Sequence, residues 1–175
     1  MIAGEGLVLH ALLDLRTVEL APPELCHEIF ASIQIEAELP RVLHALAVPE
    51  FMEAWMQLPD SDRIECYADG NTFDRFRIDM IRQGMLKGYI SGSCLLSKPN
   101  RVTYLWEMSH LNRSSRSMAE IRLWYQAGRC MLKLRHSGLA TPDEREWHSR
   151  MWQSSLSRLC GLMEGSSAPL RVELS

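Results

Sequence analysis

Apolar and polar residues alternate along the middle of the chain, between about residues 63 and 136. In residues 101–108 the side chains of Val102, Tyr104, Trp106 and Met108 share one face, and polar residues occupy most of the other. The runs at 117–126 and 129–136 have the same period of two. Strands with one apolar and one polar face predict an antiparallel sheet that exposes one side to solvent.

Turn signals divide this region into strands. Asp69-Gly70-Asn71, Gln83-Gly84, Lys98-Pro99-Asn100 and Ala127-Gly128 are all typical of tight reversals. They predict strands at 63–68, 73–82, 85–97, 101–108, 117–126 and 129–136. Within the long run 85–97, Gly88 and Gly92 predict a place where the sheet bends or admits a neighbour.

Another strand is predicted upstream, at residues 28–36, where apolar residues again alternate. Two short helices follow, one starting near Pro40 and ending at Pro49, the other starting near Glu50 and ending before Pro59. Residues 1–20 fit either a helix or a strand. We therefore expect an accessory segment at 1–22, one domain at 23–165 and a C-terminal tail at 166–175.

The last predicted element is a long helix. Thr141-Pro142-Asp143-Glu144 is a capping box, and Gly165 is a typical helix end. Between them an apolar stripe recurs at helical spacing: Trp152, Leu156, Leu159 and Met163. A helix over 142–163 spans roughly 33 Å, enough to cover the dry face of a sheet. The predicted class is α+β, with a curved antiparallel sheet of about seven strands wrapped around this helix.

The composition of the chain excludes some classes of function but does not indicate a particular one. The chain has 175 residues, with 19 Lys and Arg against 22 Asp and Glu, a net charge of −3. The lack of basic excess speaks against nucleic-acid binding. The five cysteines are widely spaced and include no CxxC pair, which disfavours disulfides and zinc and favours a cytoplasmic protein. No basic residue precedes the apolar stretch Leu7–Leu13, so we expect no signal peptide. No stretch approaches the roughly 20 apolar residues that a membrane span needs, so we expect no membrane span either.

Three stretches resemble a known family. The first is Ile33-x-Ile35-x-Ala37 with Arg41-Val42, Ala45-Leu46, Pro49-Glu50 and Trp55. The second is the run from Lys98 to Trp106, a proline turn and its following strand. The third is Leu134-x-His136-x-Gly138 with His148 and Trp152.

Together these stretches resemble the START-like (SRPBCC) superfamily of helix-grip proteins. They are most similar to the family named for the activator of the ninety-kilodalton heat-shock chaperone's ATPase. The resemblance covers about residues 27–163, with one departure at Met151, where that family often has glycine. It implies a cavity between the sheet and the long helix. Members of the superfamily bind lipids, hormones or polyketides there, and some catalyse cyclisation or dehydration.

Candidate site residues follow from the apolar face of the predicted sheet and helix. Aromatic surface with a few polar tips is typical of ligand pockets. His136 is a candidate acid or base, although a histidine hydrogen-bonded near the sheet edge and the final helix fits the pattern better. We expect a ligand to contact Tyr104, Trp106, Tyr125, His136 and Trp152.

The other potentially catalytic or metal-binding residues show no pattern that supports a site. Glu36 and Asp79 fall on polar faces, so we interpret them as solvated. His44 and His148 lack a second ligand at metal spacing, and Ser114-Ser115 has no nearby histidine. We therefore predict no catalytic residue, metal or cofactor.

Three hypotheses remain open at this point. The leading one is a binding module for a small hydrophobic molecule. A second is a cyclase- or dehydratase-like enzyme that uses His136 with Tyr104 or Tyr125. A third is an interaction role, with a chaperone or a second copy of the chain as partner. An open interior favours the first two, and a filled interior favours the third.

Overall fold

The structure is a computed structural model that describes residues 27–68, 75–97, 100–110, 113–165 and 173–174. Its eleven labelled elements run in the order β1 (His27–Ile35), α2 (Leu39–Ala47), α3 (Pro49–Trp55), β2 (Arg63–Ala68), β3 (Phe76–Arg82), β4 (Met85–Ser97), β5 (Arg101–His110), β6 (Arg113–Gln126), β7 (Arg129–Leu139), α4 (Pro142–Glu164) and β8 (Glu173–Leu174).

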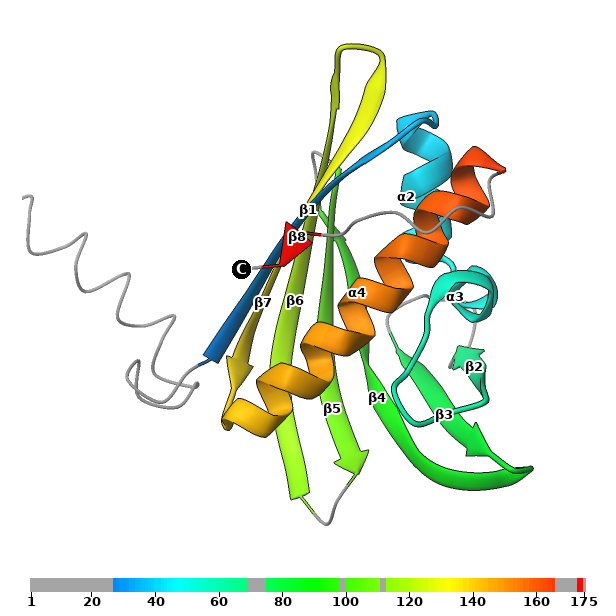
Figure 1. Cartoon of the computed structure of the whole chain (residues 1–175), viewed down its shortest axis with the longest axis vertical. Coiled ribbons are helices and arrows are strands. Elements are labelled where there is room, and N and C mark those ends of the chain that lie inside the picture. Colours follow the sequence, from blue (N-terminus) through cyan, green and yellow to red (C-terminus); the bar gives the residue numbers. More distant parts are fainter. Residues whose placement is uncertain (1–26, 69–74, 98–99, 111–112, 166–172, 175) are drawn as a thin grey trace, which may run out of the picture.

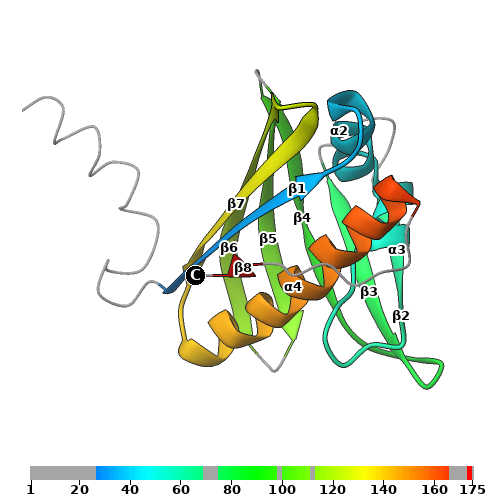
Figure 2. The ribbon, with the colours of Figure 1, turned by 45° about the horizontal axis from the view of Figure 1, so that its top comes forward.

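All these strands belong to one antiparallel sheet in the order β2-β3-β4-β5-β6-β7-β1-β8. Figures 1 and 2 show the sheet curving around α4, with α2 and α3 beside the C-terminal half of that helix. The predicted α+β class and the helix-grip architecture are confirmed. Seven of the strands match the prediction. The two-residue strand β8, which pairs with β1, is not predicted by any local sequence pattern.

The alternation of the sequence sets the inward rows of the sheet. Along β5, Val102, Tyr104, Trp106 and Met108 are all buried. Neighbouring strands present matching apolar rows, so that Leu123 on β6 lies opposite Leu132 on β7, which lies opposite Ile33 on β1. Because each strand contributes every second residue, the concave side of the sheet forms one continuous apolar layer.

Two of the predicted turns are visible as tight reversals. Gln83-Gly84 and Ala127-Gly128 have positive φ at both residues, at 53° and 74° in the first and 50° and 80° in the second. This geometry suits two-residue hairpins because its twist matches that of the flanking strands. The Asp69-Gly70-Asn71 turn lies outside the described residues, as do Lys98 and Pro99.

Gly92 confirms one of the two glycine predictions in β4. A Cβ atom built on Gly92 would overlap the carbonyl oxygen of Leu105 on β5 and would lie 3.0 Å from the ring of Phe76. Only glycine therefore allows the backbones of β4 and β5 to approach so closely. The close approach occurs next to Trp106, which is the register partner of Gly92.

Helix α4 begins and ends as the sequence predicts. The backbone N–H of Glu144 donates to Thr141 Oγ1 at 3.1 Å, and the backbone N–H of Ala140 donates to Glu144 Oε2 at 2.8 Å. Gly165 ends the helix in the left-handed region. The backbone of α4 lies closest to β1 and α3, so large side chains bridge the wider gap to the middle of the sheet. No helix in the described ranges is long and apolar enough to cross a membrane.

Candidate functional site

Four of the five predicted ligand contacts come together between the sheet and α4. Tyr104 and Trp106 from β5, His136 from β7 and Trp152 from α4 are all buried. Trp106 lies at the centre, with its ring 5.4 Å from Tyr104, 6.4 Å from His136 and 6.0 Å from Trp152 between centroids. We call these four residues the interior cluster. Tyr104 also donates its hydroxyl hydrogen to the carbonyl oxygen of Leu46 on α2.

The hydrogen bonds of His136 determine which of its ring nitrogens carries the proton. Trp152 Nε1 lies 2.8 Å from His136 Nδ1, and an indole N–H can only donate. Nδ1 of His136 is therefore the acceptor. It follows that Nε2 carries the hydrogen and donates it to Ser117 Oγ, 2.8 Å away. His136 also lies on an inner strand rather than at the sheet edge, which corrects the position expected from the sequence.

Ser117 and His136 resemble a catalytic pair, but their hydrogen bond runs in the wrong direction. In a serine nucleophile site a carboxylate accepts from one ring nitrogen, which leaves the other free to take the serine proton. In this protein the Trp152 N–H donates to Nδ1 of His136, the nitrogen that would donate to the carboxylate in such a site. Since Nε2 of His136 already carries a hydrogen, it cannot accept one from Ser117. The pair is therefore set for structural hydrogen bonding and not for activation of a nucleophile.

Burial keeps both interior histidines neutral. Desolvation lowers the pKa of His136 well below its ordinary value of 6.5, and the adjacent His148 lowers that pKa further. The pKa of His148 is also lowered, mainly by burial, although the hydrogen bond from its Nδ1 to the carbonyl of Glu144 opposes this. The two rings meet edge to face with centroids 4.6 Å apart. A second proton on either ring would create a positive charge that has no water to solvate it and that lies against another imidazole.

We expect acid to destabilise the fold through these two histidines. Their stabilising contribution is fully present above pH 6.5, where both are neutral folded or unfolded, and is lost as the pH falls toward the lowered folded-state pKa values. The slope approaches about 1.4 kcal/mol per pH unit for each histidine. Urea titrations between pH 5 and 7 measure it. His136→Gln should make the dependence shallower.

The five tryptophans differ in what their indole N–H groups do. Trp55 donates to the carbonyl of Ala45 at 2.9 Å, Trp124 to Gln126 at 3.2 Å, and Trp152 to His136. Trp106 and Trp147 are only 2% and 7% exposed, yet their N–H groups are buried without a hydrogen-bond partner. A buried donor without an acceptor costs about 1–3 kcal/mol, so such groups are rare in native structures.

Tyr125, the fifth predicted ligand contact, is far from the interior cluster. It shares an inward row with Cys130 and Ile35 but is 50% exposed, because this end of the sheet projects beyond the covering helices. It lies eight positions along β6 from Ser117, about 27 Å at the rise of a strand. The five predicted residues therefore do not form one site.

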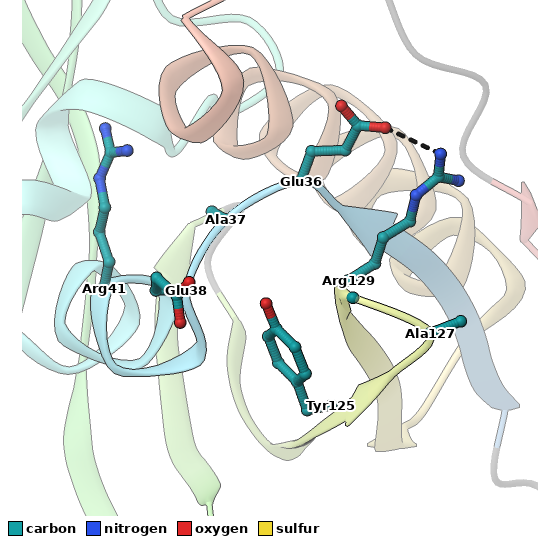
Figure 3. Close-up of a pocket in the computed structure, with 8 residues that line it drawn as sticks. Glu36, Ala37, Glu38, Arg41, Tyr125, Ala127 and Arg129 are labelled. Atoms are coloured by element: carbon teal, nitrogen blue, oxygen red, sulfur yellow. Dashed lines mark ion pairs between the residues drawn. The ribbon is translucent and has the colours of Figure 1, made fainter.

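Tyr125 lines a pocket of about 480 Å³ that we call the end pocket. Its other walls are the β6–β7 turn and the start of α2, and Figure 3 shows the Tyr125 ring standing between them. Charged side chains line the rim. Arg129 pairs with Glu36 at 2.9 Å, and Arg41 turns away to donate to the carbonyl of Met163 at 3.1 Å. The end pocket is thus open and polar, unlike the closed interior.

A second hollow, of about 560 Å³, lies over β2, β3, β4 and β5. It is lined mainly by an outward row that includes Tyr67, Arg77, Ser91 and Glu107. Arg77 donates to Asp79 at 2.6 Å and lies over the ring of Tyr89, 4.2 Å from its centroid. These residues point away from α4, so the hollow opens on the outer side of the sheet, although Phe76 and Gly92 of the inward row also line it.

In the part of the chain that the structure describes, neither a metal site nor a reactive thiol at Cys130 or Cys160 finds support. No group of three or more His, Cys, Asp or Glu there is placed to hold a metal ion. Burial raises the pKa of the Cys130 thiol and raises that of Cys160 to about 12, with Glu164 contributing at Cys160. Thiols with raised pKa values are poor nucleophiles.

Solved structures with the same architecture are numerous, although the sequence matches no protein-family model and no curated protein. Protein CV1439 from Chromobacterium violaceum is 19% identical, with a TM-score of 0.65 over 78% of this chain and 96% of that one. CalU16 from Micromonospora echinospora is 22% identical, with a TM-score of 0.57 over 79% and 76%. DynU16, described as a putative protein in the dynemicin biosynthetic locus, is 15% identical, with a TM-score of 0.57 over 82% of this chain and 49% of its own.

The chain shares their fold. At these identities the likeness extends to the architecture alone. The specific resemblance to the chaperone-activator family therefore stays a prediction.

Three residues of the interior were missed as partners by the sequence analysis. Ser117 continues the inward alternation of Ala119 and Ile121, so its direction was readable, but its bond to His136 depends on the strand register. The sequence pattern places His148 in the family resemblance and among the rejected metal ligands, but it does not predict the contact between His148 and His136. Trp147 lies on α4 beside His148, with ring centroids 5.0 Å apart, and was not considered.

Proposed function

We propose that the protein binds a small apolar molecule between the sheet and α4, where the ligand would have to part the packed rings of the interior cluster, and does not turn it over. The observation that carries the proposal is the buried, unpaired indole N–H of Trp106. This donor lies in the middle of an aromatic cluster that supplies apolar surface on several sides. An acceptor atom on a bound molecule would remove the penalty of the unpaired N–H, while the rings around it would supply affinity.

The direction of the His136 hydrogen bonds argues for binding over catalysis. A general base needs a free lone pair near its substrate and a pKa near the working pH. In His136 the lone pair of Nδ1 is taken by Trp152, and the pKa is lowered well below 6.5. The cyclase-like alternative therefore loses its best base. The likeness of the fold to DynU16, a putative protein of a biosynthetic locus, is in keeping with a small-molecule role.

Binding is tested by isothermal titration calorimetry with a panel of steroids, flavonoids and fatty acids. We expect at least one compound to bind and to raise the free energy of unfolding, by about 2.7 kcal/mol at a hundredfold excess over Kd. Trp106→Phe keeps an aromatic ring but removes the N–H, and should weaken that binding about fivefold.

Trp124→Phe is the matched control, since Trp124 lies on the outer face and already bonds Gln126. It should leave the affinity unchanged. If no compound in the panel binds, or if both variants weaken binding equally, the interior is not the binding site.

An interaction role is the second proposal, and it rests on the outer face. Leu95, Leu105 and Trp124 are exposed apolar side chains on the side of the sheet that faces away from α4. A chaperone, as the resemblance suggests, or a second copy of this chain would use this face. Unlike ligand binding, that role predicts an effect of Leu105→Ser on complex formation and none of Trp106→Phe.

A further inference from the structure

The interior cluster extends into a row of four aromatic rings that runs toward the N-terminal half of α4. Its order is Trp106, His136, His148, Trp147, with neighbouring centroids 6.4, 4.6 and 5.0 Å apart. The two unpaired N–H donors stand at the two ends of this row, and the two neutral histidines stand between them. The row therefore contains two free hydrogen-bond donors, the indole N–H groups, but no positively charged group.

Charge in the interior decides which ligands this row can take. Of the described side chains, the buried polar ones are three serines and the two histidines, and none is Lys or Arg. A carboxylate placed there would lose its hydration without gaining a counter-ion. Protonating His136 to supply one would break its hydrogen bond from Trp152, because Nδ1 would then carry a hydrogen of its own.

We propose that the ligand is a neutral apolar molecule that carries a carbonyl-type acceptor, and that Trp106 Nε1–H donates to this acceptor. Trp147 supplies a second donor for a ligand long enough to follow the row. The inference rests on the proposed function and adds the chemical class of the ligand. It excludes anions such as fatty-acid carboxylates as preferred ligands.

Three naphthalenes of nearly equal size test the class directly by calorimetry. They are 2-acetylnaphthalene, which is neutral and has an acceptor, 2-ethylnaphthalene, which has none, and 2-naphthoate, which is an anion. We expect the ketone to bind about five- to tenfold more tightly than the hydrocarbon, as one buried hydrogen bond provides, and the anion to bind most weakly. In Trp106→Phe the ketone and the hydrocarbon should bind equally, whereas Trp124→Phe should keep the difference.

A second measurement does not depend on the stability of any variant. The five tryptophans give five indole N–H resonances in an NMR spectrum of the intact chain. Addition of the ketone should shift the Trp106 resonance downfield, and addition of the hydrocarbon should not, because only the ketone accepts a hydrogen bond.

The possible outcomes separate the two proposals. If hydrocarbon and ketone bind with equal affinity, or if the anion binds best, the ligand class is wrong while small-molecule binding stands. If the preference for the ketone survives in Trp106→Phe, Trp106 is not the donor. If neither these probes nor the wider panel binds, the proposed function itself fails.

Discussion

Replacement of Trp152 by alanine is expected to cost about 3–5 kcal/mol of folding free energy, the range for large-to-small changes at aromatic core positions. Trp152 is completely buried, and its ring meets Trp106 and His136 edge to face. The substitution would leave a cavity where α4 covers the sheet. It would also strip the hydrogen bond from Nδ1 of His136, which no water can reach easily.

Urea denaturation followed by circular dichroism measures this loss. Trp124→Ala is the control, because the Trp124 side chain is 36% exposed on the outer face and its removal should cost less than about 1 kcal/mol. Trp152→Phe separates the two contributions, since it keeps most of the ring and loses only the donor. A loss below about 1 kcal/mol for Trp152→Ala would mean that this face of α4 does not pack on the sheet.

The second large effect is expected at Gly92. Alanine there would place a methyl group against the backbone carbonyl of Leu105, and backbone in the middle of a sheet cannot move aside cheaply. We expect a loss of about 3 kcal/mol, at the upper end for overpacking. Equilibrium unfolding measures it, with Ser91→Ala as the control on the same strand but on the outward row. If Gly92→Ala is as stable as Ser91→Ala, the two strands are not held as closely as the structure has them.

Local signals account for what the sequence predicted well. The strands, their inward residues and both ends of α4 follow from alternation, turn residues and a capping box, each contained within about ten residues. The convergence of Tyr104, Trp106, His136 and Trp152 also followed, because inward residues of a sheet and the apolar stripe of its covering helix must meet.

What the sequence missed depends on contacts between distant segments. The exposure of Tyr125 depends on how far α2 and α4 reach over the sheet, which no local pattern records. The bond from His136 to Ser117 needs the β6–β7 register, and β8 pairs with β1 through only two residues. The proton position on His136 depends on Trp152, sixteen residues away along the chain.

The indole N–H of Trp152 also bears on how a protein of this fold could acquire a catalytic serine during evolution. Ser117 and His136 already stand at the distance that a nucleophile and its base require. An acceptor in place of Trp152 would draw the hydrogen to Nδ1 of His136 and free Nε2 to accept from Ser117. The present arrangement and one that activates a serine would then differ by the direction of two hydrogen bonds, and a change of one side chain would be enough to begin the conversion.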